Sequence, residues 1–87
     1  MDEEQWETCL NDLMDRQMNV TKMNGVIFTV ALSSSQVRVF VEAHGQRCQQ
    51  YFIYRKATDD VAKRVIQKID NYLNSLSDLE TWVRLNN

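Results

Sequence analysis

Proline is absent from the 87-residue chain, and glycine occurs only twice, as Gly25 and Gly45. Linkers between domains are usually rich in these two residue types, so the sequence marks no boundary. A chain of this length is the size of one small domain, and we expect a single domain over residues 1–87. A glycine-rich phosphate-binding loop is excluded, because such a loop needs several glycines within a few residues.

Histidine occurs once, as His44, and cysteine twice, as Cys9 and Cys48. Cys9 and Cys48 are 39 residues apart, no second histidine accompanies His44, and the three residues lack the spacing of a zinc site. Nucleophilic catalysis needs a positioned base beside the nucleophile, and no such arrangement is evident. We therefore expect a protein that is not an enzyme and that uses neither a metal nor a cofactor.

No apolar run approaches the roughly 20 residues of a membrane-spanning helix. The first residues are acidic, whereas a secretory signal begins with basic residues followed by an apolar stretch. Two unpaired thiols fit a reducing compartment. The expected location is the cytoplasm, with no membrane contact.

Charge is unevenly distributed although the net charge is only −2. Residues 1–15 contain six acidic and no basic residues, and Glu3, Glu4 and Glu7 are candidates for contact with a basic partner. A basic cluster of Lys56, Lys63 and Arg64 lies near the start of the second expected helix. This cluster is the candidate for nucleic-acid contact, although an isoelectric point near 5.2 is far from typical of nucleic-acid-binding domains.

Hydrophobic periodicity predicts an α+β protein. Apolar residues recur with helical spacing in three segments and with period two in three others. Ser77-Asp78-Leu79-Glu80 matches a capping box and separates the last two helices. The predicted elements are a helix over 2–18, strands over 25–32, 37–43 and 47–55, and helices over 58–74 and 78–85. The order αβββαα implies a two-layer fold, in which an antiparallel meander with 37–43 at its centre carries helices mainly on one face.

Two tight turns set the expected register of the sheet. A turn on Ser34-Ser35 pairs Val30 with Val39, and a turn on His44-Gly45 pairs Val39 with Gln50. Histidine tolerates the left-handed conformation that the second turn needs. The predicted core face holds Val26, Phe28, Val30, Leu32, Val37, Val39, Val41, Cys48, Phe52 and Tyr54. The predicted second face holds Ile27, Thr29, Ala31, Arg38, Phe40, Glu42, Arg47, Gln49, Tyr51, Ile53 and Arg55.

This second face is the candidate binding surface, because helices on one side of the sheet leave it exposed. It combines aromatic and apolar residues with arginine, which is the composition of a protein-binding surface. The candidate contact residues are Arg38, Phe40, Tyr51, Ile53 and Arg55. Two alternatives remain: the face stacks nucleic-acid bases, or the last helix crosses it and Trp82 covers it as a second small core.

The core order αβββα is similar to that of double-stranded-RNA-binding domains. "TDDVAKRV" carries two aspartates where the RNA-binding version carries lysines, which argues against that activity. The order αβββαα and the size are also similar to those of small phage-encoded inhibitors of bacterial defence enzymes, and dimeric secretion chaperones likewise combine helices with three strands. The expected function is therefore that of a small inhibitor or adaptor that binds a protein, encoded by a phage or mobile element. The alternatives are a nucleic-acid-binding regulator and a dimeric chaperone, and a homodimer is compatible with each.

Overall fold

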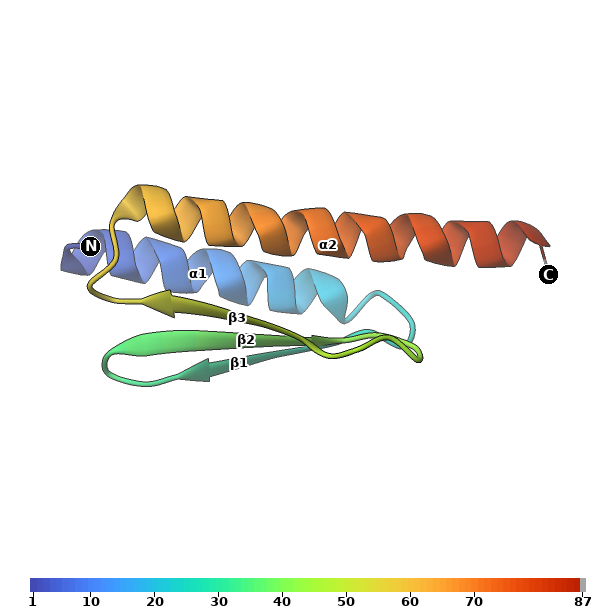
Figure 1. Ribbon diagram of the computed structural model, residues 1–87, viewed down its shortest axis with the longest axis horizontal. Helices are drawn as coiled ribbons and strands as arrows, with labels where there is room; N and C mark the ends of the chain where they lie inside the picture. The colour runs from blue at the N-terminus through green and yellow to red at the C-terminus, as the bar shows by residue number, and fades with distance from the viewer. Residues whose placement is uncertain (87) are drawn as a thin grey trace.

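The computed structural model describes the backbone of residues 1–86 and the side chains of residues 1–76. The elements follow one another as α1 (Glu3–Val20), β1 (Ile27–Leu32), β2 (Gln36–Glu42), β3 (Gln49–Tyr54) and α2 (Asp59–Asn86). The molecule is elongated, with extents of 48 × 20 × 20 Å (Figure 1). This arrangement confirms the α+β class and the order αβββα.

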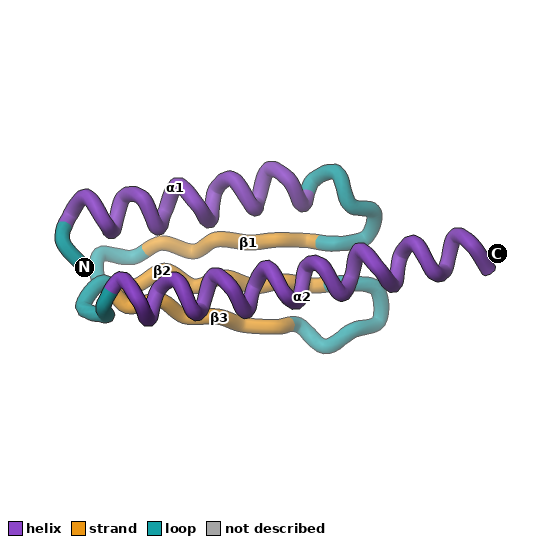
Figure 2. Tube along the Cα trace, turned by 90° about the horizontal axis from the view of Figure 1, so that it is seen from above, coloured by secondary structure: helices purple, strands orange, loops and turns teal. Residues whose placement is uncertain are grey.

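The three strands form one antiparallel sheet in the order β1-β2-β3, with β2 in the centre. Both helices lie on the same side of this sheet, α1 along β1 and α2 along β3 (Figures 1 and 2). The predicted meander and the predicted two-layer packing are therefore confirmed.

The helix α1 begins at a capping box. The carboxylate of Asp2 accepts a hydrogen bond from the backbone N–H of Gln5, and the side chain of Gln5 accepts one from the N–H of Asp2. Both bonds satisfy donors that a helix start otherwise leaves without partners. On the inner face of α1, Trp6, Cys9 and Leu13 recur at helical spacing and are buried, as the sequence predicts.

The helix α2 runs without interruption from Asp59 to Asn86, so the predicted break between helices 58–74 and 78–85 is wrong. No proline or glycine lies near residue 77 to stop the helix. Leu76 is buried against the rest of the molecule, and this packing favours continuation at the place where the capping-box pattern predicts a new start. Since α2 continues in its original direction, it does not cross the opposite face of the sheet (Figure 1). The side chain of Trp82 lies outside the described residues.

The first hairpin has the predicted register. Val30 pairs with Val39, and the tight turn is closed by the backbone N–H of Ser33, which donates to the carbonyl of Gln36 at 2.9 Å. The hydroxyl of Ser33 also accepts a hydrogen bond from the N–H of Gln36. Serine thus supplies side-chain bonds that hold this turn together.

The second hairpin is displaced by one residue from its predicted register. Val39 pairs with Tyr51, not with Gln50. A two-residue type I′ turn needs a positive φ at both central residues. Here only Gly45 has one, at 59°, and His44 does not. The turn closes from Gln46 to Ala43 and is followed by additional residues before β3 begins.

A displacement of one residue moves every side chain of β3 to the other face of the sheet. Tyr51 and Ile53 therefore face the helices, whereas Phe52 and Tyr54 face away from them. The predicted faces are correct for β1 and β2 and wrong for β3.

The hydrophobic core fills the space between the sheet and the two helices. Val37, Val39 and Val41 of the central strand are fully buried, as are Leu13 and Ile69 of the helices. The complete buried set is Trp6, Cys9, Leu13, Val20, Phe28, Val37, Val39, Val41, Ile53, Ala62, Ile66, Ile69 and Leu76. Within the described side chains, no polar or charged residue is classed as buried.

Candidate functional site: the open face of the sheet

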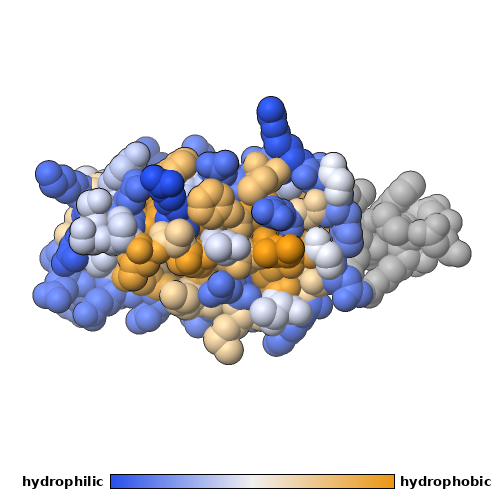
Figure 3. Space-filling view, turned by 90° about the horizontal axis from the view of Figure 1, so that it is seen from below, coloured by the Kyte–Doolittle hydropathy of each residue, from blue (hydrophilic) through white to orange (hydrophobic). Residues whose placement is uncertain are grey.

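The face of the sheet turned away from the helices is exposed, and we call it the open face. Its side chains alternate with the buried ones along each strand. It holds Ile27, Thr29 and Ala31 of β1, Gln36, Arg38, Phe40 and Glu42 of β2, and Gln50, Phe52 and Tyr54 of β3. Figure 3 shows apolar residues gathered at the centre of the molecule on this side, with hydrophilic residues around them.

Arg38 and Phe52 form the best-defined contact on the open face. They are directly opposite each other on β2 and β3. The guanidinium carbon of Arg38 lies 5.7 Å from the centroid of the Phe52 ring, which is cation–π distance. The pair combines a cation with an aromatic ring, and arginine and aromatic residues are both enriched where proteins bind one another.

Large apolar side chains of the open face remain in contact with solvent. The exposed fractions are 58% for Ile27, 40% for Phe52 and 56% for Tyr54. Phe40 is half-buried at the centre of the face, between Thr29 and Gln50 in the register. Removal of such a group of side chains from water is favourable, so the face can gain free energy by contact with a partner.

The predicted binding residues divide between the two faces. Arg38 and Phe40 lie on the open face, as predicted. The placement of Tyr51, Ile53 and Arg55 there is wrong: Ile53 is 2% exposed, and Tyr51 is half-buried under the helices. Tyr51 and Ile53 lie on the covered face because the register of β3 differs by one residue from the predicted one. Arg55 continues the same alternation beyond the end of the strand.

Phe52 and Tyr54 are the open-face residues that the sequence prediction assigned to the core. β3 is apolar on both faces, so its alternation alone does not say which side is buried. The signal that could have found them is His44-Gly45, because type I′ turns favour asparagine or aspartate before glycine. Histidine in that position favours a longer connection, and the longer connection changes the register.

Tyr51 is a structural residue. Burial, followed by the nearby Tyr72, raises the pKa of its phenol above the usual value. The Tyr72 hydroxyl is itself buried and makes no hydrogen bond to any described residue. The two tyrosines connect β3 to α2 by packing, and neither is available to a partner on the open face.

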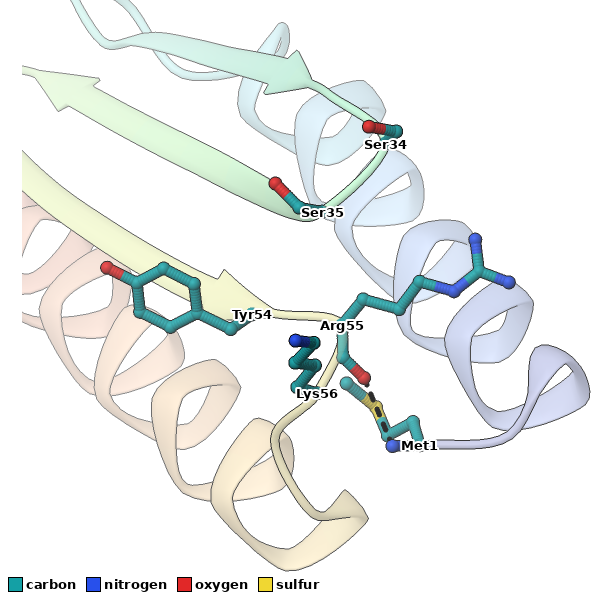
Figure 4. Close-up of a pocket in the computed structure, with 6 residues that line it drawn as sticks. All are labelled: Met1, Ser34, Ser35, Tyr54, Arg55 and Lys56. Carbon is teal, nitrogen blue, oxygen red and sulfur yellow. Dashed lines mark hydrogen bonds between the residues drawn. The ribbon is translucent and has the colours of Figure 1, made fainter.

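Arg55 turns toward the helix layer, where its guanidinium carbon lies 6.0 Å from the ring centroid of the buried Trp6. The adjacent Lys56 and Tyr54 line an open hollow of about 640 Å³ at the end of the sheet (Figure 4). Ser34 and Ser35 form its other side. No carboxylate or imidazole is among its lining residues, and the α-amino group of Met1 donates hydrogen bonds to the backbone carbonyls of Arg55 and Ala57.

The acidic and basic candidates lie away from the open face. Glu3, Glu4 and Glu7 are exposed on the first turns of α1. On α2, the ammonium of Lys63 lies 2.9 Å from the carboxylate of Asp59, one turn earlier, and this hydrogen bond raises the pKa of Lys63.

Arg64 is exposed beside Lys63, and Lys56 precedes the helix. Asp59 partly neutralises the basic cluster of Lys56, Lys63 and Arg64, because it forms an ion pair with Lys63.

The candidates for metal or thiol chemistry do not converge. Cys9 is buried on α1, where burial raises the pKa of its thiol, and the carboxylates of Asp12 and Asp59 raise it further. Cys48 is half-buried in the β2–β3 connection. No group of three histidine, cysteine or acidic side chains capable of metal binding occurs among the described residues.

His44 has a structural contact. Its imidazole lies over Gly25, in the α1–β1 connection, at the position that a β-carbon would occupy. Gly25 also has a φ of 72°, which other residues rarely adopt. Glycine at position 25 therefore allows the connections α1–β1 and β2–β3 to pack together.

Comparison with known proteins gives no relative: no family model, no curated protein and no solved structure matches the chain significantly. In the described part of the chain, neither helix has both the length and the apolar character that a membrane crossing needs.

Proposed function

We propose that the chain is a small, non-enzymatic protein-binding module, and that it acts as an inhibitor or adaptor by occupying a partner's surface with the open face. The supporting observation is the exposure of Ile27, Phe52 and Tyr54 on a sheet face that neither helix covers. Phe40 and the Arg38–Phe52 pair lie among them at the centre of the face.

The charge of the open face favours a protein partner over nucleic acid. Arg38 and Glu42 are its only charged residues, so the face carries no net charge. Affinity for nucleic acid comes mainly from lysine and arginine contacts to phosphates. A base-stacking surface would need such residues around its aromatics, and the basic residues Lys63 and Arg64 lie on α2, across the molecule.

The test is affinity capture from the native host with two matched double variants. Phe52→Ser with Tyr54→Ser removes two exposed aromatics from the open face. Met14→Ser with Met18→Ser removes two side chains of α1 that are 44% and 70% exposed and serves as the control. All four side chains are exposed, so both variants should retain the wild-type circular dichroism spectrum.

We expect the wild-type chain and the α1 variant to retain the same partner protein, and the open-face variant to lose it. Retention by the open-face variant would contradict the proposal. Recovery of nuclease-sensitive material, with binding that weakens steeply as salt increases, would instead support the nucleic-acid alternative.

A further inference from the structure

The outer edge of β3 has unused hydrogen-bonding groups. The backbone N–H of Arg55 donates to the carbonyl of Ser35 on the β2 side at 2.9 Å. In an antiparallel pair, alternate residues bond to the neighbouring strand. The backbone groups of Gln50 and Phe52 therefore point outward, and within the described residues they have no hydrogen-bond partner.

The outer edge of β1 differs because α1 covers it. The side-chain amide of Gln17 donates to the carbonyl of Phe28 at 3.2 Å, which occupies an outward-pointing acceptor. Figure 2 shows α1 lying outside β1, so that the helix extends past this edge. A second sheet with its own helices on the same side would collide with α1 before its strand reached β1.

At the β3 edge the strand, and not the helix, lies outermost. Figure 2 shows β3 at the margin of the molecule, with α2 set back over the sheet. On α2, Asp70 faces α1, where it bonds Arg16, and Ala62 faces the sheet. Helical spacing then places Val61, Val65, Lys68 and Tyr72 on the flank away from α1, above the edge of β3, and the long side chain of Lys68 is exposed at the outer margin of this flank. Val61 is 44% exposed.

The sequence of β3, QQYFIY, has no charge and no proline. Natural edge strands usually carry lysine, proline or a bulge that prevents pairing with another strand. Two identical uncharged strands can approach each other without repulsion.

We propose that a second copy of this chain pairs with the first through β3, antiparallel and about a two-fold axis. Three strands from each copy then form one continuous sheet, and the α2 flanks of Val61, Val65 and Tyr72 pack against each other above it. A stable interface buries roughly 800 Å² on each partner. The edge of a six-residue strand is only about 17–20 Å long, so the α2 flanks must contribute.

This dimer uses a different surface from the open face. It places the two open faces side by side on one enlarged sheet, so the dimer can form whether or not the proposed protein-binding function holds. Its test accordingly uses variants that keep Phe52 and Tyr54 intact.

Sedimentation equilibrium of the full chain over a concentration series measures the dimer. Gln50→Pro removes an outward N–H without removing a bond to β2, and Val61→Lys places two like charges at the α2 contact. We expect each change to raise the dimer dissociation constant about tenfold or more, since each removes or opposes contacts in both copies.

The matched controls lie on the β1 side. Leu32→Pro removes an outward N–H from β1, and Met14→Lys changes a residue with the same 44% exposure as Val61. We expect both to retain the wild-type dissociation constant. A wild-type chain that stays monomeric at millimolar concentration overturns the proposal. So does a dimer that the two control variants weaken and the two β3-side variants leave unchanged.

Discussion

The two faces of the sheet are made by the same three strands but have opposite roles. On β2, Val37, Val39 and Val41 are fully buried under the helices, while Arg38 and Glu42 alternate with them in solvent. On β3 the two faces are chemically alike, because Tyr51 and Ile53 are as apolar as Phe52 and Tyr54. The difference between the covered face and the open face is thus encoded by side-chain chemistry in β2 and by register in β3.

The largest expected effect is the difference in lost stability between substitutions at two neighbouring residues of β3. Ile53→Ala should lower the free energy of unfolding by about 2–5 kcal/mol, because it leaves a cavity at a site that is 2% exposed. Phe52→Ala should cost less than about 1 kcal/mol, since Phe52 is 40% exposed. Urea denaturation measures both. Equal losses would mean that β3 is buried on both sides.

The second effect concerns the connections at the end of the sheet where β3 begins. Gly25→Ala should cost about 1–3 kcal/mol, because alanine is strained at a φ of 72° and its β-carbon meets the His44 ring. Thermal denaturation measures the loss. His44→Ala in the same chain removes the clash and leaves the strain, so the double variant should recover part of the stability. No recovery would contradict the packing of His44 on Gly25.

A third, smaller effect concerns the ion pair between the two helices that cover the sheet. The guanidinium of Arg16 on α1 makes two hydrogen bonds to the carboxylate of Asp70 on α2, at 2.9 and 3.0 Å. Both side chains are about 30% exposed, so solvent screens the pair. A double-mutant cycle with Arg16→Ala and Asp70→Ala should give a coupling free energy of about 0.2–1 kcal/mol. Partner binding through the open face should be unchanged in all three variants.

The smallest effect is a pH dependence that reports the burial of Tyr51 on the covered face. The pKa of Tyr51 is raised, so the folded protein holds this proton more tightly than the unfolded chain does. The resulting stabilisation is complete below the unfolded pKa of about 10 and is lost as the pH rises through the folded pKa. Tyr51→Phe should flatten the alkaline decline in the free energy of unfolding, measured by urea denaturation at several pH values. An unchanged decline would contradict the burial of the Tyr51 phenol.

The sequence predicts the helix-covered layer well, because its signals are redundant. The alternation in β1 and β2 and the Ser34-Ser35 turn all agree on one register. In β3 the alternation favours neither face, and the prediction relied on a single turn whose conformation His44 does not adopt. The capping-box pattern from Ser77 to Glu80 failed for a similar reason, because local preference yields when packing and the absence of a helix breaker favour continuation.

The number of residues in the connection from Ala43 to Cys48 decides which side chains of β3 are exposed. An insertion or deletion of one codon there would exchange Phe52 and Tyr54 for Tyr51 and Ile53 at the exterior, while an apolar pair still filled the core. Such a change leaves every side chain of β3 the same and yet alters which of them are exposed. Diversification of this surface can thus proceed through indels as well as through point substitutions.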